Sequence, residues 1–437
     1  MNRAWLEALF EWSAVRWLAA TVLMGRGGMW WITGRRYRAF VDICWVARVS
    51  GVVPWEGIAD RLVFRVLGEA KRTGRNPVVD WYRADSASRE CADLFTLTGN
   101  GKADLLRDLI VLKSPSGDEK GVILLKYVRT FSAVVALFDL ERLMGRYQFV
   151  LEPCWAGYCD PGLLMFVTAG HPVIVQCFTD ADHAFVSRIG YPMVPVPLGP
   201  ADWVNAEVFD LPTPTEKTYD VVMVANWARH KRHALLFRAL QGIRDRDLKV
   251  LLVGFPWAGR TSDDVRREAA AFPNERVTLT IEEQVPHSEL AKLLQQCKVF
   301  LFLSKKEGDN KALVEAMFAD VPAIVYERTI GGASSRINAA TGVLASDKDL
   351  PAAIRYMLDH RDQFAPRRWA LEHTGSEVAT RVVDDALRAA ATRSGQAYTT
   401  AIVEKINAPN LAYREPSSRA RFQADYDFIF SCRRKAG

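Results

Sequence analysis

The clearest pattern in the chain is a series of short apolar runs separated by longer segments that suit helices. In the second half, Val, Leu and Ile nearly fill these runs, which lie at 220–225, 248–254, 277–280, 299–304 and 323–326. Strands that are apolar throughout are covered on both faces, as in a parallel sheet wrapped by helices. The pattern therefore predicts an α/β domain that binds its ligands at the carboxyl ends of the strands.

A weaker form of the same pattern begins at residue 121. The proposed strands of this first half lie at 121–126, 149–152, 173–178 and 193–197, and residues 60–108 are predicted to be mostly helical. A Pro-, Thr- and Glu-rich stretch at 211–218 then suits an exposed linker. We predict an N-terminal domain over 1–211, a second domain over 212–385, and a helical, basic extension over 386–437 with no sheet of its own.

Composition narrows the class of protein. The chain has 437 residues, of which 49% are hydrophobic and 25% charged, so it can bury a large core and is not a disordered protein. A net charge of +6 over this length is too dilute for a nucleic-acid binder. The seven cysteines are an odd number without a CxxC pair, which favours neither a disulfide framework nor a paired zinc site. We expect a protein of the reducing cytoplasm.

The N-terminus is rich in both arginine and tryptophan. Residues 1–40 contain six Arg, two Glu and five of the 13 Trp, within an aromatic and basic helical extension predicted over 1–60. Such a composition suits a peripheral contact with the cytoplasmic face of a membrane, and it equally suits a helix packed on the protein's own core. No apolar run is long enough to span a bilayer, and acidic residues interrupt any signal peptide.

The most informative stretch is SKKEGDNKALVEAMFADVPAIV at 304–325, which leads from a strand through a polar loop into a helix. If Asn310 caps a helix that begins near Lys311, Glu315 lies about one turn inside it while Glu307 stays on the loop. The two carboxylates can then face one cleft at different depths. The free N–H groups of the helix start, together with Lys311, would attract a diphosphate.

This segment resembles the donor-binding region of retaining GT-B glycosyltransferases, especially glycosyltransferase family 4. The likeness covers about 220–360 and rests on the Glu-x7-Glu spacing together with Ser304, Glu307-Gly308, Glu315-Ala316-Met317 and Val321-Pro322. It implies two Rossmann-like domains facing a central cleft, and transfer of a sugar from a nucleotide sugar with retention. It further implies that Glu315 binds the nucleotide ribose, that Glu307 lies near the transferred sugar, and that no metal or cofactor besides the donor co-substrate is needed.

A basic loop at 221–240 supports the resemblance. The family usually has an Arg in this loop and a Lys five residues later, and this chain has Asn226 and Lys231 at those positions. The resemblance implies that Lys231, helped by Arg229 or Arg232, neutralises the charge that develops on the leaving diphosphate. Without the resemblance, this loop would be interpreted as a solvated surface.

Two further details bear on the donor site. The segment 331–344 carries Gly331, Gly332 and Gly342 at the places expected for a family loop and turn, although ordinary turn chemistry would also explain them. After Glu307 the family often reads Gly-Phe-Gly, whereas this chain reads Gly308, Asp309, Asn310, Lys311. The donor-binding set is therefore Asn226, Arg229, Lys231, Gly308, Asn310, Lys311 and Glu315, and the identity of the donor is not transferable from the family.

The acceptor side resembles the family only weakly, over about 149–210. Phe178 occupies the position where the family often has a histidine, so His183 becomes the candidate for acceptor contact or proton relay, against a merely structural histidine. Glu152, at the end of a predicted strand, is a comparable candidate. The resemblance implies that the acceptor is a growing surface polysaccharide or a lipid-linked saccharide.

Two other functions stay open at this point. Asp180 and Asp182 form an Asp-x-Asp pair, which in a different glycosyltransferase fold binds a divalent metal with the sugar diphosphate. A metal-dependent transferase would follow. Alternatively, Asn226 and the missing histidine permit a non-catalytic protein that binds a nucleotide sugar or acts as a scaffold.

Overall fold

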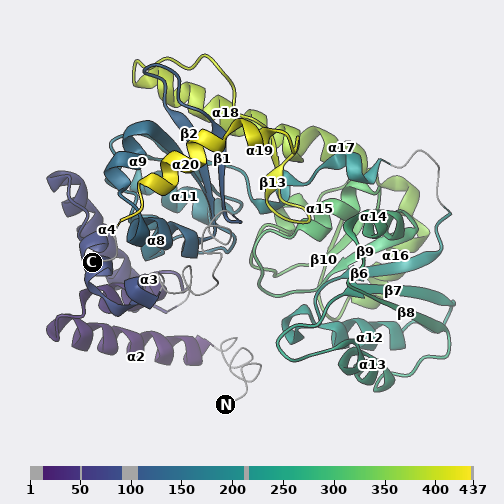
Figure 1. The fold of residues 1–437 in the computed structure, drawn as a ribbon. Coiled ribbons are helices and arrows are strands. Elements are labelled where there is room, and N and C mark those ends of the chain that lie inside the picture. The colour runs from purple at the N-terminus through teal and green to yellow at the C-terminus, as the bar shows by residue number, and fades with distance from the viewer. Residues whose placement is uncertain (1–12, 50–51, 91–106, 211–215, 435–437) are drawn as a thin grey trace. The chain divides into compact units, whose positions relative to one another are not determined.

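The protein folds into two compact units, each with its own sheet (Figure 1). The computed structural model describes residues 13–49, 52–90, 107–210 and 216–434. Unit 1 comprises the described parts of Met1–Gly199, Thr380–Lys405 and Leu411–Gly437, and unit 2 comprises those of Pro200–Ala379 and Ile406–Asn410.

The sheet of unit 1 has five strands in the order β1-β2-β3-β4-β5. The strands are β1 (Leu109–Lys113), β2 (Gly121–Lys126), β3 (Tyr147–Glu152), β4 (Val173–Gln176) and β5 (Met193–Val196). β1 runs antiparallel to β2, whereas the other neighbours are parallel. The four strands predicted from residue 121 onward are confirmed. β1 was not predicted, because an isolated run of five residues carries no readable period and is easily assigned to a neighbouring helix.

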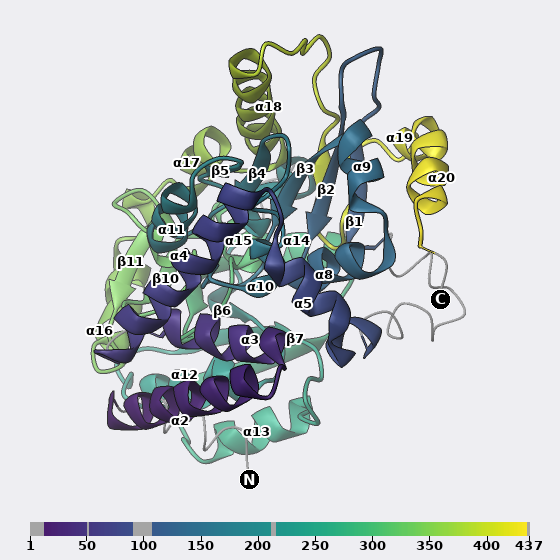
Figure 2. The same ribbon diagram turned by 90° about the vertical axis from the view of Figure 1, so that its left-hand side faces the viewer.

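Helices connect and cover these strands. α8 (Val128–Leu137), α9 (Leu140–Arg146), α10 (Pro161–Leu164) and α11 (Asp180–Ile189) lie between consecutive parallel strands. Before the sheet come α2 (Ser13–Ile32), α3 (Arg36–Ala47), α4 (Trp55–Thr73) and α5 (Pro77–Ala84), which confirm the predicted N-terminal helices. Figures 1 and 2 both place α3 between α2 and the other helices of unit 1. Parts of the helical predictions, over 1–12, 50–51 and 91–106, lie outside the described residues.

The end of the chain returns to unit 1 and covers the edge of its sheet. This segment contains α18 (Ser376–Arg393), β12 (Lys405–Ile406), β13 (Ala412–Tyr413), α19 (Ser418–Arg421) and α20 (Gln423–Ser431). The hydroxyl of Tyr413 donates to the carbonyl of Val111 at 2.7 Å, and the Val111 amide donates to the hydroxyl of Tyr426 at 3.2 Å. Because β12 and β13 form a two-stranded sheet, the expectation of a tail without a sheet is wrong.

A buried charge cluster ties this returning segment to the carboxyl ends of two strands. Glu152, at the end of β3, accepts a hydrogen bond from Nζ of Lys405 at 2.6 Å and lies 3.8 Å from Nζ of Lys126, at the end of β2. Glu152 and Lys405 are fully buried. Burial lowers the pKa of Lys405 to about 7, although Glu152 favours its charged form.

The sheet of unit 2 has six parallel strands in the order β11-β10-β9-β6-β7-β8. They are β6 (Tyr219–Val224), β7 (Leu248–Gly254), β8 (Val277–Glu283), β9 (Cys297–Phe302), β10 (Ala323–Tyr326) and β11 (Gly342–Ala345). The chain runs outward from β6 to β8 and then starts again at β9 on the other side of β6. Sheets with this order bind nucleotides at the reversal, outside the carboxyl ends of its two strands.

Alternate residues of the four inner strands of unit 2, β6, β7, β9 and β10, supply two separate cores. Val222 and Phe300 pack on the face that is covered by α14 (His287–Gln295) and α15 (Lys311–Phe318). Val221 and Leu301 pack on the opposite face, under α12 (His233–Gln241), α13 (Ser262–Ala270) and α16 (Leu350–Asp359). This two-sided burial explains the continuous apolar runs, and all five strands predicted in this half are confirmed.

The limits of the units differ from the predicted domain limits. Ala201, Val204 and Phe209 pack in the core of unit 2 beside Phe318, so this unit begins before the predicted boundary at 211/212. A linker at 211–218 cannot be compared in full, since 211–215 lie outside the described residues. The predicted separate extension over 386–437 also differs from the structure. Its described residues belong to unit 1, together with α18 from Thr380 onward, except for Ile406–Asn410, which belong to unit 2.

The predicted α/β class with two Rossmann-like units is confirmed. No helix among the described residues combines the length and apolar character that a membrane span requires. The cysteines at 44, 154, 159, 177, 297 and 432 are free thiols.

Replacing Lys405 by Met is expected to change how thermal stability depends on pH. The unfolded chain keeps its proton at this position up to the ordinary pKa of 10.5, whereas the folded chain loses it near pH 7. The unfolded state therefore binds more protons between these values, so stability rises with pH there by at most about 1.4 kcal/mol per pH unit. Between about pH 7 and about pH 9, the unfolding midpoint of the wild type should rise relative to that of Lys405→Met.

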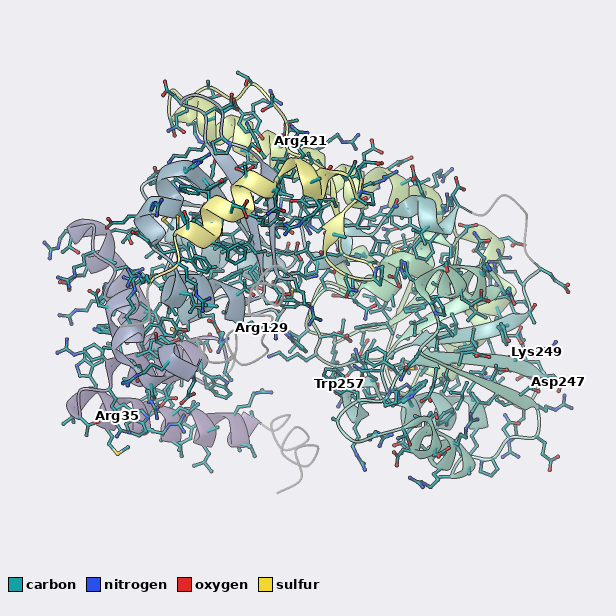
Figure 3. All side chains as sticks on the ribbon, in the orientation of Figure 1. Arg35, Arg129, Asp247, Lys249, Trp257 and Arg421 are labelled. Atoms are coloured by element: carbon teal, nitrogen blue, oxygen red, sulfur yellow. The ribbon has the colours of Figure 1, made fainter. Side chains whose placement is uncertain are left out.

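Lys249 offers the matched control, because its side chain is exposed on β7 (Figure 3). Lys249→Met should keep the pH profile of the wild type. Identical profiles for the wild type and Lys405→Met would contradict the lowered pKa.

Candidate active site

Lys231 and Glu307 meet where the strand order of unit 2 reverses. Lys231 follows β6 and Glu307 follows β9, the two neighbouring strands that flank the reversal. Nζ of Lys231 forms an ion pair with Oε1 of Glu307, and only 9% of the Lys231 side chain and 17% of the Glu307 side chain are exposed. The second carboxylate oxygen, Oε2 of Glu307, is buried and has no hydrogen-bond partner among the described residues. A buried acceptor of this kind calls for an explanation, because leaving it unpaired costs about 1–3 kcal/mol.

The loop that carries Lys231 is fixed from both sides. Oδ1 of Asn226 accepts from the amide of Ala228 at 3.2 Å, which closes a turn directly after β6. Trp227 is fully buried and donates its indole N–H to Glu283 at 2.6 Å, while Nε of Arg260 donates to the Trp227 carbonyl at 2.8 Å. The sequence position that the family fills with Arg thus holds a side chain that shapes the loop.

The loop that carries Glu307 rests on a glycine. The amide of Glu307 donates to the carbonyl of Ile330 at 2.9 Å, and the Ile330 amide donates to the Lys305 carbonyl at 2.8 Å. Gly331 follows with a φ of 143°, and a Cβ at this position would lie 2.3 Å from the carbonyl oxygen of Glu307 and 2.7 Å from that of Gly308. Only glycine allows this approach and this φ.

The predicted helix start is confirmed. Asn310 caps α15, which begins at Lys311, and its Oδ1 accepts from the amide of Leu313 at 2.8 Å. Nδ2 of Asn310 also reaches Oε1 of Glu307 at 3.4 Å. Nζ of Lys311 donates to the carbonyls of Asn407 at 2.8 Å and Pro409 at 3.3 Å, so residues 406–410 occupy two of its three donors.

Glu315 has a partner that the sequence did not suggest. Its Oε1 lies 3.0 Å from Nε2 of His287, the first residue of α14, and both side chains are largely buried. The ring of Phe209 packs edge-on against His287 at 5.6 Å. His287 was missed, although a Pro-His helix start after β8 could have marked it, because helices of such sheets begin at the edge that binds ligands.

A second missed feature is a buried network behind Glu307. Arg336 donates to Asp202 at 2.7 Å and to Asp309 at 2.8 Å, and the amide of Ala201 donates to Asp309 at 2.9 Å. Thr374 donates to Asp202 at 2.6 Å. Burial alone would lower the pKa of Arg336, but the two carboxylates hold it above its ordinary value. Asp309, at the position where the family often has an aromatic residue, is therefore an anchor for the loop.

A basic hollow lies beside the loop of Lys231. It has a volume of about 530 Å³, and its charged lining residues are Arg229, Arg232, Arg238, Asp347 and Lys348. Arg232 is already engaged, since it pairs with Asp347 and donates to the carbonyl of Leu303 at 3.1 Å. Arg229 is exposed. The hollow adds positive potential to this edge of the sheet.

The acceptor-side candidates all lie in unit 1. His183 is half-buried on α11, with Nδ1 3.5 Å from the hydroxyl of Ser187 one turn later. Glu152 is enclosed in the lysine cluster described above. Asp182 is buried and accepts from the amides of Gly157 at 3.0 Å and Tyr158 at 2.8 Å.

The Asp-x-Asp pair does not present two ligands to one ion. Thr179 caps α11, and Asp180 and Asp182 both lie in its first turn, where residues two apart point in different directions. The carboxylate of Asp182 is already occupied by backbone N–H donors and by the hydroxyl of Thr179 at 2.7 Å. In the part of the chain that the structure describes, no group of three or more His, Cys, Asp or Glu could hold a metal ion.

Comparison with known families agrees with this geometry. The family model for glycosyl transferases group 1 matches residues 207–369, somewhat more than a third of the chain. The matched range contains every strand of unit 2 together with Lys231, His287, Glu307 and Glu315. Among curated proteins, none matches this chain. The family match supports the likeness of unit 2 to GT-B glycosyltransferases.

Several solved structures are similar to the chain at low identity. A glycosyltransferase from Rickettsia africae is 15% identical, with a TM-score of 0.48, over 63% of this chain and 77% of that one. HepE from Anabaena, in complex with UDP, is 15% identical, with a TM-score of 0.47, over 62% and 78%. A TarM mutant from S. aureus, in complex with fondaparinux, alpha-GlcNAc-glycerol and UDP, is 16% identical, with a TM-score of 0.42. That comparison covers 56% of this chain and spans half of the TarM chain.

Replacing Gly331 by Ala is expected to destabilise the Glu307 loop. The new Cβ would overlap backbone oxygen atoms of Glu307 and Gly308 that cannot move away like a flexible side chain. We expect a loss of more than about 3 kcal/mol, because a steric clash adds to the cost of the unusual φ. Urea unfolding of the wild type and of Gly331→Ala measures this loss of unfolding free energy.

Gly259 is the matched control, because its φ is 77° but nothing lies within 4 Å of a Cβ added there. Gly259→Ala should therefore lose only about 1 kcal/mol. Equal losses in the two variants would contradict the close approach at Gly331.

Proposed function

We propose that the protein is a glycosyltransferase that moves a sugar from a nucleotide-sugar donor to a saccharide acceptor. The observation that carries this proposal is the unpaired, buried Oε2 of Glu307 beside Lys231 at the reversal of strand order in unit 2. A carboxylate oxygen with no partner can accept a hydrogen bond from a sugar hydroxyl. The group 1 family match over the same residues supports the same activity.

Lys231 acts on the leaving group. Its ammonium has three donors, so it keeps its ion pair with Glu307 and still offers N–H groups to a diphosphate. As the bond between the sugar and the diphosphate breaks, negative charge grows on the diphosphate. A fixed cation in a largely buried position stabilises that charge without reorganising. Arg229 and the basic hollow add to the attraction.

The remaining groups position the nucleotide sugar. The N–H groups at the start of α15 face the diphosphate, and Gly308 and Asn310 hold that start in place. Glu315 accepts hydrogen bonds from the ribose hydroxyls, and His287 holds its carboxylate in orientation. Asn226 keeps the Lys231 loop in its turn. Lys311, the first residue of α15, contributes its positive charge to the attraction of the diphosphate.

Unit 1 receives the acceptor in this proposal. His183, half-buried on α11, is the candidate for contact with the acceptor or for proton relay. The acceptor is a growing surface polysaccharide or a lipid-linked saccharide, as the resemblance to family 4 implies. The site of action is the cytoplasm, in agreement with the free thiols, with a peripheral membrane contact through residues 1–40.

Transfer proceeds with retention and without a metal ion. Retention is proposed from the family 4 resemblance alone. Independence of metal is supported by Asp182, whose oxygens are engaged by N–H and O–H donors instead of being free to bind a cation. In place of a metal, Lys231 supplies the positive charge that the leaving diphosphate needs.

Substituting Glu307 by Gln is expected to lower the rate of nucleotide release by about 100-fold or more, because it removes the charge that orients both Lys231 and the sugar. The measurement is nucleotide release from a panel of nucleotide sugars, after thermal-shift screening identifies the donor that stabilises the protein. Lys231→Met should show a loss of similar size.

Glu327→Gln is the matched control, since Glu327 lies at the end of β10 with an exposed carboxylate. Its rate should equal that of the wild type. If wild-type protein binds a donor but releases no nucleotide with any acceptor extract, the protein is a nucleotide-sugar-binding scaffold instead. Equal rates for wild type and Glu307→Gln would contradict the role of Glu307.

Treatment with EDTA is expected to leave the transfer rate unchanged. Loss of activity that Mg²⁺ or Mn²⁺ restores would revive the metal-dependent alternative through Asp180 and Asp182.

NMR of the product should show the anomeric configuration of the donor. Inversion of the anomeric centre would contradict the family 4 assignment.

A further inference from the structure

The outward face of α2 is apolar, while its inward face packs Leu23 and Met24 together with the small residues Ala20 and Gly27. Only Ala20 and Gly27 of this helix are buried. The large side chains of Leu18, Val22 and Ile32 are 60%, 58% and 87% exposed. The outward face of a surface helix in a globular protein normally carries polar or charged side chains instead.

The exposed residues form one continuous stripe. At about 100° per residue, positions 18, 22, 25, 29 and 32 fall within about 80° of the helix circumference. These positions are Leu18, Val22, Gly25, Met29 and Ile32, and none of them is charged. The stripe runs from Leu18 to Ile32, through the last 15 of the 20 residues of α2.

A tryptophan side chain borders the stripe on one side. Trp17 is 43% exposed, and its indole N–H donates to the carbonyl of Val53 at 3.1 Å. Val53 is itself 74% exposed. Of the sixteen large apolar side chains that are exposed among the described residues, seven lie between positions 17 and 53. Apolar exposure is therefore concentrated on this one region of unit 1.

The same region has a positive net charge, which is partly neutralised because Arg38 pairs with Asp85 at 3.4 Å and Arg48 with Asp160 at 3.1 Å. Residues 13–48 contain six Arg and one Asp, and that aspartate, Asp42, is paired with Arg26 at 2.6 Å. Arg35 lies beside the end of α2 with its guanidinium 4.9 Å from the ring centre of Trp30 (Figure 3). Arg36 is similarly placed over Trp31, at 5.8 Å. Arginine next to exposed tryptophan is the pairing that suits the headgroup level of a bilayer.

We propose that α2 lies in the plane of an anionic lipid bilayer, with its apolar stripe inserted at the boundary between headgroups and acyl chains. Leu18, Val22, Met29 and Ile32 enter the acyl region, Trp17 lies at the headgroup level, and Arg35 and Arg36 contact lipid phosphates. A bilayer can take up a narrow apolar stripe by burying it alone. A protein partner would also have to supply hydrogen-bond donors and acceptors for the polar groups around the stripe. The inference does not rest on glycosyl transfer.

The test is flotation of the full chain with lipid vesicles, without donor or acceptor. We expect binding to vesicles of phosphatidylcholine with roughly 30% phosphatidylglycerol and much weaker binding to phosphatidylcholine alone. Leu18→Ser combined with Ile32→Ser should reduce the bound fraction at least about tenfold, because two exposed apolar side chains no longer enter the bilayer. Arg35→Gln with Arg36→Gln should remove most of the preference for the anionic lipid.

Leu344→Ser combined with Leu371→Ser is the matched control, because these leucines are 48% and 49% exposed in unit 2. This control should bind vesicles like the wild type. Equal vesicle binding by the α2 variant and the control would overturn the proposal.

Two further measurements identify other occupants of the stripe. A dimer in light scattering that the α2 variant converts to a monomer, with no vesicle binding by the wild type, would assign the stripe to a second copy of the chain. A lower thermal midpoint for the α2 variant than for the control would mean that the stripe packs within the protein. Either result would contradict the membrane assignment, and neither bears on nucleotide release.

Discussion

The ion pair between Lys231 and Glu307 is the interaction on which the candidate site depends. A largely buried pair of charges loses much of its solvation, so its net contribution to stability is small or negative. One oxygen of Glu307 is buried with no partner among the described residues, which makes the arrangement costlier still. A contribution to stability therefore does not explain this pair, whereas a ligand that completes its hydrogen bonds would explain it. The reversal of strand order places the pair where a nucleotide-binding sheet receives its ligand.

The surroundings of the pair are built to hold it still. Trp227 anchors the Lys231 loop through its hydrogen bond to Glu283. Gly331 lets the Glu307 loop lie directly against a neighbouring backbone segment. Behind Glu307, Arg336 joins Asp309 to Asp202, because its guanidinium donates hydrogen bonds to both carboxylates. Charged groups that must act without reorganising need this kind of support, because small displacements of a catalytic group cost large factors in rate.

The sequence predicted those parts of the molecule that local patterns encode. Apolar runs located nine strands, and Asn310 was identified as a helix cap because its side chain satisfies an amide only three residues away. The meeting of Lys231 and Glu307 followed from a family resemblance, since no local rule joins residues 76 positions apart. His287, Arg336 and Lys405 were missed for the same reason. Their partners lie far away in the sequence, and nothing in the residues around them marks which carboxylate they will meet. β1 was missed because an edge strand of five residues has too few positions for a period to be visible.

The path of the chain means that neither unit is a continuous stretch of the gene. It crosses from one unit to the other at four places, after residues 199, 379, 405 and 410. A clone that stops at residue 379 would keep the whole six-stranded sheet but lose the carbonyls that hold Lys311, and its other half would lose the tyrosines that cover β1. Each half is thus finished by a segment that is synthesised after both large sheets.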